Sequence, residues 1–507
     1  MFATVLLAIV TLILLIIYLV VGQHTRKTPP GPFSWPIFGN QFLMKRLIRE
    51  FGGQHEAFLE LSKRYASDVI TVTMGNEKVL IVSGSKLCET ILKSEEFDGR
   101  PWNEFIKLRN MGKKQGITMN DGAEWKELRS WMLRTMRVFG FGKREMAQMI
   151  RNELTILLND MSTEGPHKLR PLITPTVINV LWFLTTGESF SRGERIESFI
   201  KLMETRAQVF DMMGGLISAF PWIRHIAPEF SGYNLLCTLN KELKDFLMKT
   251  IIEHKKRYKP GSEADVIDMF LHEMKNHGET SPIFTDEQLV ILLIDLFLAG
   301  FTTTSLTLDF LLLTMTVYQD VQHKVQKEID SVIPRDRLPD LEDKAKLPYV
   351  EAVISEVQRM WPVFPIIGPR RVVHDTILDK YTVPRNTTIL VNMYSVNKDP
   401  NIYPEPDKFM PERFIKNDIY EPDKYSLQFG RGKRRCPGEV LAKSALFILF
   451  TGVMQKYNLR PVPGKGPNSV EIIYGLTSSP KPYEFQLSKL EEATDHWQPF
   501  WTYPNIE

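Results

Sequence analysis

The stretch of sequence that decides the fold is Phe429-Gly430-Arg431-Gly432-Lys433-Arg434-Arg435-Cys436-Pro437-Gly438. It places one cysteine in a glycine-broken loop rich in Lys and Arg, just before an apolar helical stretch that starts at Leu441. A cationic surround and a helix N-terminus both favour the thiolate over the thiol. A basic loop with one cysteine is nevertheless often a solvated surface turn, so the loop alone leaves a ligand site and a surface turn as alternatives.

The composition of the 507-residue chain is that of an ordinary globular protein, with 43% hydrophobic, 24% charged and 11% aromatic residues. These values exclude a disordered chain, a collagen and a small disulfide scaffold. The formal charge of +3 is too small for a nucleic-acid footprint over the whole surface, so we expect no nucleic-acid partner. Three scattered cysteines, Cys88, Cys237 and Cys436, are not a disulfide framework and indicate a reducing compartment.

An apolar appendage precedes the globular part of the chain. Phe2 to Val21 is an uncharged run of 20 residues, long enough as a helix to cross a bilayer core of about 30 Å. A cleavable signal peptide is the alternative, but the run exceeds the usual apolar region of roughly 7 to 15 residues. Arg26 and Lys27 follow the run, which predicts that the rest of the chain is cytosolic. We therefore expect an anchor with a basic flank over residues 1–28 and one folding unit over 29–507, joined by a proline-rich hinge at 29–32.

Beyond residue 40 the pattern is mostly helical, with a minority of short strands. Val69 to Thr73 and Lys78 to Val82 flank Gly75-Asn76, which predicts a hairpin with a tight turn.

A very apolar run begins at Thr285 to Gln288, which has the form of a capping box, and continues to Leu313. Its length and composition also suit a second membrane span. Gly300 and the polar Thr302 to Ser305 in its middle favour a buried helix that lines a cavity, and the single charge of Asp295 is tolerable at one edge.

The cysteine loop resembles the haem-binding loop of the cytochrome P-450 family at every defining position, F-x-x-G-x-R-x-C-x-G. The resemblance implies that Cys436 is the axial ligand of a haem iron, and that Phe429, Gly432, Arg434 and Gly438 shape the loop around the cofactor. Without the resemblance to this family, a solvated surface turn would be the favoured interpretation of the loop.

Two further motifs match the same family. Glu356 and Arg359 match its E-x-x-R helix, and Arg413 in Pro411-Glu412-Arg413-Phe414 matches the arginine that completes a buried charge network with them. Spacing alone would favour an exposed ion pair worth under about 1 kcal/mol. The resemblance implies burial, and makes these residues structural supports of the haem loop.

The resemblance also implies a set of haem propionate partners. Trp125 and Arg129 match the W-x-x-x-R helix of the family, and Arg434 is a further partner. Arg100 and Arg370 occupy places where the family often has one. Buried carboxylates need cationic or donor partners, so arginines are chemically suited to this role.

Ala299-Gly300-Phe301-Thr302-Thr303-Thr304 resembles the oxygen-activation pattern of the family. Small Ala299 and Gly300 would let the helix backbone approach the haem, and Thr303 takes the place of the threonine that assists oxygen activation. Thr302 departs from the pattern, because the family usually has Asp or Glu there. A hydroxyl can pass a proton along but cannot supply one as a carboxylic acid does. The departure admits haem-thiolate isomerases or dehydratases that act on peroxides, and a non-catalytic haem-binding sensor is a further alternative.

The implied protein is mainly α with small β-sheets (α+β), a P-450 prism behind a single N-terminal transmembrane anchor, with 29–507 as a haem-thiolate catalytic domain that binds haem b. The implied activity is insertion of one oxygen atom from O2 into a lipophilic substrate, by hydroxylation or epoxidation. The microsomal branch takes electrons from NADPH-cytochrome reductase, with cytochrome b5 as a second donor, and places the catalytic domain on the cytosolic side of the endoplasmic reticulum membrane.

The substrate itself stays open among steroids, terpenoid hormones, fatty acids and xenobiotics. By resemblance, five segments line its pocket: residues 101–119, Val209 to Ile223, which includes Phe210, Met212 and Met213, Ile294 to Thr303, Val363 to Ile367, and the turn at Leu476 and Thr477. A local basic face for the acidic reductase would consist of Lys126, Arg134, Arg137, Lys433 and Arg435, with an ordinary solvated surface as an equal alternative.

Overall fold

The structure is a computed structural model that describes residues 7, 10–13, 28–75, 77–162, 165–190, 192–209, 216–278, 281–475 and 477–490. The predicted anchor, taken as a whole, and the flanking Arg26 and Lys27 lie outside the described residues. Pro29 and Pro30 of the predicted hinge dock on a strand, because their carbonyl oxygens accept hydrogen bonds from the Thr71 hydroxyl at 3.1 Å and the Thr71 N–H at 2.7 Å.

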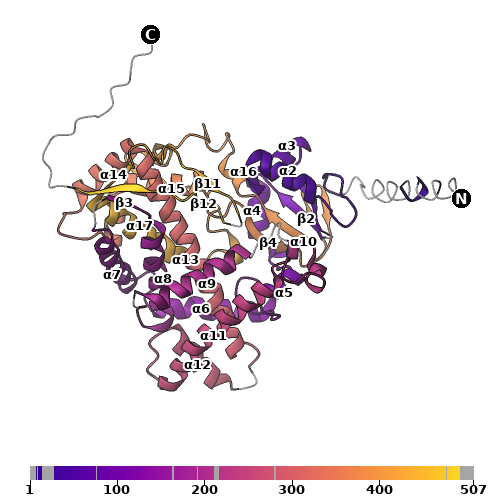
Figure 1. Ribbon diagram of the computed structural model, residues 1–507, viewed down its shortest axis with the longest axis horizontal. Coiled ribbons are helices and arrows are strands. Elements are labelled where there is room, and N and C mark those ends of the chain that lie inside the picture. Colours follow the sequence, from indigo (N-terminus) through magenta and orange to yellow (C-terminus); the bar gives the residue numbers. More distant parts are fainter. Residues whose placement is uncertain are drawn as a thin grey trace, which may run out of the picture.

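The described part of the chain is mostly helical, with one sheet beside the N-terminal helices α2 and α3 and another, which includes β3, at the opposite side near α14 and α17 (Figure 1). The α-helices are α2 (Gln41–Phe51), α3 (Gln54–Arg64), α4 (Ser85–Lys93), α5 (Glu104–Arg109), α6 (Gly122–Val138), α7 (Arg144–Asp160), α8 (Arg170–Thr186), α9 (Glu194–Val209), α10 (Leu216–Ala219), α11 (Tyr233–Arg257), α12 (Val266–His277), α13 (Asp286–Val317), α14 (Gln319–Val332), α15 (Pro348–Met360), α16 (Tyr394–Asn397) and α17 (Glu439–Lys456). Short 3-10 turns are η1 (Glu95–Phe97), η2 (Pro221–His225), η3 (Leu341–Lys346), η4 (Pro411–Phe414) and η5 (Gly432–Arg434).

The largest sheet has four strands in the order β1-β2-β7-β4. Its strands are β1 (Val69–Met74), β2 (Glu77–Val82), β7 (Thr388–Val391) and β4 (Ile367–Arg371). Strands β1 and β2 are antiparallel, and Thr73 pairs with Lys78, which confirms the predicted hairpin; Asn76 of its turn lies outside the described residues.

The other sheets have two or three strands each. A three-stranded sheet, β10-β13-β3, joins β10 (Tyr457–Pro461), β13 (Phe485–Lys489) and β3 (Gly165–His167), and the two-stranded sheets pair β5 (Thr376–Leu378) with β6 (Tyr381–Val383), β8 (Ile415–Lys416) with β9 (Ile419–Tyr420), and β11 (Ile472–Ile473) with β12 (Ser479–Pro480).

Helix α13 runs through the middle of the helical part and packs against α8, α15 and α17 (Figure 1). It begins where the sequence predicted, because the Thr285 hydroxyl accepts a hydrogen bond from the Gln288 N–H at 3.2 Å, and it ends at Val317. Among the described residues it alone is long and apolar enough to cross a membrane. Its most apolar stretch is 72% buried by other elements, as in a core helix of a globular protein.

Asp295 on α13 differs from the sequence-based expectation. It does not lie at a tolerant edge: the side chain is buried, and it accepts hydrogen bonds from the backbone N–H groups of Ile117 and Thr118. The loop that covers it comes from a distant part of the chain, so the periodicity of the helix could not show the burial.

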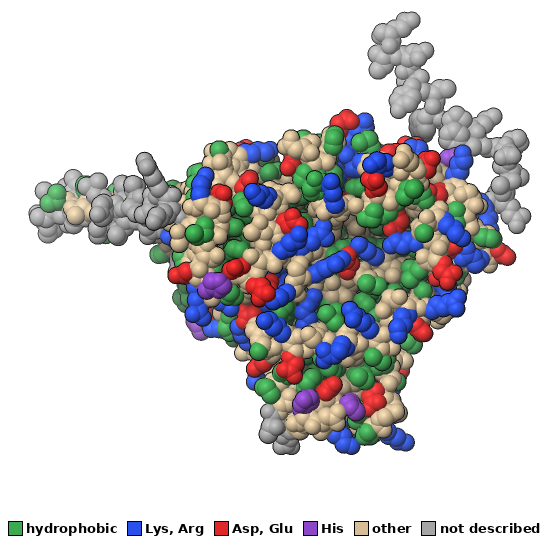
Figure 2. All heavy atoms as spheres, turned by 180° about the vertical axis from the view of Figure 1, so that it is seen from behind, with side chains coloured by type: hydrophobic (Ala, Val, Ile, Leu, Met, Phe, Trp, Pro, Cys, Tyr) green, Lys and Arg blue, Asp and Glu red, His purple; other side chains and the backbone are tan. Residues whose placement is uncertain are grey.

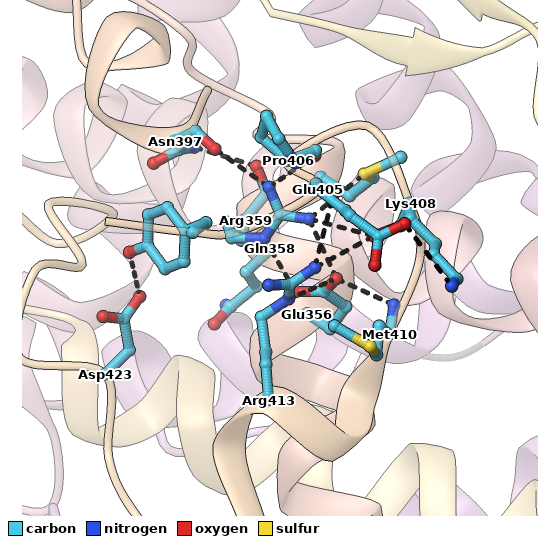
Figure 3. A network of polar contacts seen from close by, with 12 residues as sticks. Glu356, Gln358, Arg359, Asn397, Glu405, Pro406, Lys408, Met410, Arg413 and Asp423 are labelled. Carbon is cyan, nitrogen blue, oxygen red and sulfur yellow. Dashed lines mark hydrogen bonds and ion pairs between the residues drawn. The ribbon is translucent and has the colours of Figure 1, made fainter. Parts of the chain in front are cut away.

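A closed charge network fixes α15 to the chain that leads to the cysteine loop (Figure 3). Arg359 donates to both carboxylate oxygens of Glu356, at 2.7 and 2.8 Å, and Arg413 donates to the same carboxylate at 3.0 Å. Glu356 and Arg359 are 0% and 2% exposed. The remaining donors of Arg359 reach backbone carbonyls, including those of Asn397 and Pro406. Each charge in the network therefore has a partner inside the protein.

We expect Glu356→Gln to lower the free energy of unfolding by about 3–5 kcal/mol, because it leaves two guanidiniums without their counter-charge in a buried place. Denaturant titration followed by circular dichroism measures the change. The matched control is Glu60→Gln on α3, which removes an ion pair of the same 2.7 Å length from an exposed position beside Arg64. That change is expected to stay below about 1 kcal/mol. Equal effects for the two variants would contradict the structural role of the network.

Candidate active site

The cysteine loop is a tight turn closed by its own backbone. The Cys436 N–H donates to the Phe429 carbonyl at 2.8 Å, and the Arg435 N–H donates to the Gly432 carbonyl at 3.1 Å. Gly438 is the N-cap residue of α17, so the thiol lies just before the start of an 18-residue helix. Cys436 keeps surface open to solvent although the protein packs around its thiol, whereas Cys88 is buried in the core, where desolvation raises its pKa to about 12.

The pKa of Cys436 corrects the expectation drawn from the basic loop. Desolvation by the surrounding protein raises this pKa, and the Gly438 N–H, Arg129 and Arg435 offset the effect only in part. The negative charge of Glu439 raises this pKa further. Lys433 pairs with Glu95, and Arg435 pairs with Glu439 at 2.6 Å. A metal ion bound to the sulfur would displace the proton directly.

Gly432 holds the loop against α4. Its φ is +66°, and a Cβ added there would overlap the carbonyl oxygen of Leu92 on α4. The glycine therefore allows a backbone-to-backbone contact between two segments that are far apart in the sequence. Gly430 has a similar φ of +69°, but a Cβ there would meet nothing closer than 3.9 Å.

Four arginines predicted as cofactor partners gather behind the cysteine loop. They come from four separate segments: Arg100 after η1, Arg129 on α6, Arg370 on β4 and Arg434 in η5. Arg434 donates to the carbonyl of Asp98 at 2.7 and 3.0 Å and to that of Asn120 at 2.8 Å. Arg129 donates to the Arg435 carbonyl.

The other two arginines of this set of four, which we call the arginine cluster, join residues 98–100 to strand β4. Arg370 pairs with the Asp98 carboxylate at 2.8 Å, and Arg100 donates to the Pro369 carbonyl at 2.5 Å. The second carboxylate that acts on the cluster, Asp121, is shared with other cations, because Lys114 and Arg371 also pair with it. Sequence reasoning missed both aspartates. Asp98 is only two residues before Arg100, but nothing local shows that its carboxylate turns toward a strand 272 residues away.

The arginine cluster carries more positive charge than its partners neutralise. Burial, followed by the charge of Arg370, lowers the pKa of Arg434 to about 9. Burial also lowers the pKa of Arg100 and that of Arg370, and neighbouring arginines add to each effect. A guanidinium stays protonated at neutral pH, so these shifts express a cost of holding like charges together.

Two donors in the cluster lack partners. The Nε atoms of Arg100 and Arg370 are buried and form no hydrogen bond in the structure. Buried donors are rarely left unpaired unless a ligand or water completes them. The donor set, together with the nearby thiol, therefore fits a cofactor that carries two carboxylates and a metal ion, as haem does.

Trp125 is engaged differently from what its motif implied. Its Nε1–H donates to the Ile117 carbonyl at 3.0 Å, so its single donor is occupied. The indole instead supports the cluster through its ring, because the Arg434 guanidinium lies 3.4 Å from the ring centroid and that of Arg129 lies 5.8 Å away.

The oxygen-activation motif lies on α13 with its small residues on different faces. Ala299 is exposed in the middle of a buried stretch, and the Thr303 hydroxyl donates to the Ala299 carbonyl at 2.7 Å. Gly300 instead serves helix packing, because a Cβ there would lie 2.6 Å from Leu181 on α8. The Thr302 hydroxyl is buried and has no hydrogen-bond partner.

The predicted basic face divides into exposed and paired residues. Lys126, Arg134 and Arg137 on α6 are exposed, whereas Lys433 and Arg435 are held in ion pairs. Figure 2 shows a face of the molecule over whose middle Lys and Arg side chains gather. Of the predicted pocket-lining residues, Phe210, Met212, Met213 and Leu476 lie outside the described part of the chain, as does the side chain of Val209.

Comparison with known proteins agrees with this geometry. The family model described as Cytochrome P450 matches residues 29–487. The chain is 35% identical over 481 residues to a probable cytochrome P450 305a1 of Drosophila melanogaster, covering 92% of this chain and 95% of the relative. It is 32% identical to a farnesoate epoxidase of Bombyx mori, covering 94% and 97%. It is also 33% identical to the human cytochrome P450 2J2, covering 90% of each chain.

We expect Gly432→Ala to destabilise the protein more than Gly430→Ala, although both place a side chain at nearly the same positive φ. The left-handed backbone alone should cost about 1 kcal/mol or more in each variant. The overlap with Leu92 should add about 1–3 kcal/mol in Gly432→Ala. Denaturant titration of both variants measures the difference, and equal losses would show that the loop does not depend on its contact with α4.

Proposed function

Since the chain belongs to the cytochrome P450 family, we propose that it is a membrane-anchored haem-thiolate monooxygenase that inserts one oxygen atom from O2 into a lipophilic substrate. The observation that carries the proposal is the arginine cluster, with its unpartnered Arg100 and Arg370 Nε atoms, beside a loop that presents Cys436. A protein that kept the fold only as a scaffold would have no use for buried cations in excess of their counter-charges.

The cofactor of the proposal is haem b. Cys436 would ligate its iron, the four arginines of the cluster would hold its propionates, and Phe429, Gly432 and Gly438 would shape the loop around it. A thiolate-ligated haem supplies the redox-active iron at which O2 is activated. The propionates would give Arg100 and Arg370 the acceptors that they lack and would neutralise the excess charge of the cluster.

The Thr302 and Thr303 hydroxyls of α13 would accept and pass on protons beside the cofactor. Thr303 donates to the Ala299 carbonyl at 2.7 Å, so its oxygen can accept from a water or ligand while this bond holds. Thr302 offers a second, unpartnered hydroxyl one residue away. Neither can supply a proton as a carboxylic acid does, so the proton would come through water or from an acid elsewhere in the protein. This feature is also what keeps a peroxide-using isomerase or dehydratase as the second candidate function.

An exposed apolar surface supports the membrane location. It combines residues that follow the proposed anchor with residues near η2: Phe33, Trp35, Ile37, Phe38, Phe42, Trp222, Ile226, Phe230 and Leu235. The two groups are adjacent in space, because the ring centroids of Phe38 and Phe220 lie 5.8 Å apart. Large exposed apolar patches mark membrane or protein contacts. With residues 1–28 as a single-pass anchor and 29–507 as the catalytic domain, this surface would rest on the cytosolic face of the endoplasmic reticulum.

The electron donors of the proposal are NADPH-cytochrome reductase and cytochrome b5. The exposed Lys126, Arg134 and Arg137 of α6, the helix that also carries Arg129, provide positive charge for an acidic partner. For the substrate, the farnesoate epoxidase among the relatives favours the terpenoid class among the open alternatives.

The ligation proposal predicts that Cys436→His removes the thiolate signature of the haem. The ferrous carbonyl form of the parent protein should absorb at the far red-shifted position that thiolate ligation produces, and the variant should not. Cys237→Ser, at an exposed position on α11, is the control and should keep the parent spectrum. A red-shifted band in the Cys436→His variant would contradict the assignment.

The activity itself is tested by the coupling between NADPH consumption and product. Thr303→Ala should keep haem content and substrate binding while it yields less product and more peroxide per NADPH, because proton assistance is typically worth about 10²- to 10⁴-fold. Thr302→Glu should shift the balance toward product where the missing acid is limiting. Purified protein with reductase, NADPH and a lipid extract provides the measurement. Product formed from peroxides without NADPH would favour the isomerase or dehydratase instead, and unchanged coupling in Thr303→Ala would contradict its role.

A further inference from the structure

A cluster of buried polar side chains that the candidate active site does not use lies where the ends of three helices meet. His254 comes from the last turn of α11, and Asp265 and Asp268 come from the N-terminal end of α12. These side chains are buried, and Asp268 is 6% exposed. One ring nitrogen of His254 and one oxygen of each carboxylate lie within 4.8 Å of one another. We refer to the three residues as the His254 cluster.

The hydrogen bonds of His254 indicate which ring nitrogen carries a proton. Its Nδ1 lies 2.8 Å from the Thr250 carbonyl oxygen, which can only accept, so we assign the proton of the neutral imidazole to Nδ1. The lone pair is then on Nε2. Two oxygens face this nitrogen: the Thr186 carbonyl oxygen at 3.2 Å and the Asp265 Oδ2 atom at 3.1 Å. Three atoms with lone pairs thus converge on one place, which requires a cation.

The guanidinium of Arg257 occupies this place. Its Nη2 atom donates to His254 Nε2 at 2.7 Å and to the Thr186 carbonyl at 3.0 Å, and it lies 3.4 Å from Asp265 Oδ2. The Arg257 side chain is 43% exposed, and its other terminal nitrogen pairs with the exposed Glu188. The guanidinium can therefore withdraw toward Glu188 and solvent and keep an ion pair, which would leave the place open to another cation.

Asp268 supplies an oxygen that the guanidinium does not use. Its Oδ2 atom accepts the Ala264 N–H at 3.3 Å, whereas its Oδ1 atom is buried and has no hydrogen-bond partner among the described residues. Buried polar atoms are rarely left without a partner unless water or a ligand completes them. The unpartnered oxygen belongs to a side chain of the His254 cluster, so it indicates a ligand that binds there in addition to, or in place of, Arg257.

The donor atoms and their spacing suit a divalent transition-metal ion. Zn²⁺ binds His nitrogen and Asp oxygen at about 2.0–2.2 Å, so neighbouring ligands of a tetrahedral site lie about 3.3–3.6 Å apart. The separations of 3.1 and 3.2 Å at His254 Nε2 are close to that spacing. The bond from Nδ1 to Thr250 is the kind of second hydrogen bond that orients metal-binding histidines. Thr186 is the last residue of α8, where the helix dipole also favours a cation.

We propose that His254, Asp265 and Asp268, together with the carbonyl oxygen of Thr186, form a binding site for a divalent transition-metal ion that enters by displacing the Arg257 guanidinium. The ion would join the ends of α8, α11 and α12. Mixed nitrogen and oxygen ligands favour Zn²⁺ over Mn²⁺, and a histidine ligand disfavours Mg²⁺ and Ca²⁺. The inference does not depend on the proposed monooxygenase function. The opposing interpretation is a buried charge network in which Arg257 is the permanent cation.

Zinc binding by the full-length protein, purified with its haem and freed of loose metal by a chelator, tests the site. Equilibrium dialysis against buffered Zn²⁺ with metal analysis should give one ion per chain. Asp268→Asn keeps the shape of the side chain and its acceptor for Ala264 but removes an anionic ligand, so the dissociation constant for Zn²⁺ should rise about ten-fold or more. Arg257→Gln removes the competing cation, so the dissociation constant should fall about ten-fold.

The matched control is His272→Asn, also on α12. His272 Nδ1 lies 2.9 Å from a carboxylate oxygen of Glu263, so the two form a more exposed pair of the same ligand types. This variant should bind Zn²⁺ as the parent does. A second measurement uses stability: Zn²⁺ should raise the unfolding temperature of the parent, of His272→Asn and of Arg257→Gln, and should raise that of Asp268→Asn much less.

The opposite signs of the two variants separate the metal site from the charge network. Parent affinity for Zn²⁺ in Asp268→Asn overturns the inference, and so does an affinity that is lost in His272→Asn, because the ion would then bind at the surface. Unchanged or weaker binding in Arg257→Gln would show that the guanidinium is the permanent cation. Arg257 is half-exposed, so its variant decides the question even where Asp268→Asn does not fold, and a parent protein that binds no Zn²⁺ also overturns the inference.

Discussion

An excess of buried positive charge around Asp98 is the constraint on which the candidate site depends. Arg100, Arg129, Arg370 and Arg434 meet from four segments of the chain, and one of the two aspartates beside them, Asp121, is shared with Lys114 and Arg371. Like charges gathered in a desolvated place are unfavourable unless an anion joins them. The fold therefore holds this cluster in readiness for a ligand that brings negative charge, and the thiol of Cys436 lies in the loop that supplies one of the four arginines.

The contrast with the second buried charge network shows why the two have different roles. Glu356 neutralises Arg359 and Arg413, and the remaining guanidinium donors end on backbone carbonyls, so that network is complete within the protein. The arginine cluster keeps buried Nε atoms without acceptors. A closed network stabilises a fold, whereas an open one is completed by a ligand. This difference, and not the number of arginines, separates a structural support from a binding site.

Helix α13 contacts several parts of the site, because different faces of the helix make different contacts. Gly300 turns toward Leu181 and lets α8 pack closely, while Ala299 is exposed and its carbonyl accepts the Thr303 hydroxyl. Asp295 accepts the N–H of Ile117, whose carbonyl accepts from Trp125, and the Trp125 ring contacts Arg434. Helix α13 has no carboxylic acid at Thr302. It does carry the buried carboxylate of Asp295, but that carboxylate accepts hydrogen bonds from the loop at Ile117 and Thr118.

Sequence alone determined the features that depend on local chemistry. Turn geometry, capping and motif spacing depend only on residues that are close together in the sequence. They predict the hairpin at Gly75, the helix start at Thr285 and the loop around Cys436. The tertiary structure alone decided the partners of each charged or polar group. Trp125 gives its donor to Ile117, Gly300 faces Leu181, and Arg434 reaches the Asp98 carbonyl 336 residues away. The raised pKa of Cys436 likewise comes from desolvation and from the charge of Glu439. Desolvation and pairing depend on which distant segments are brought together, and that information is not present in any short stretch of the chain.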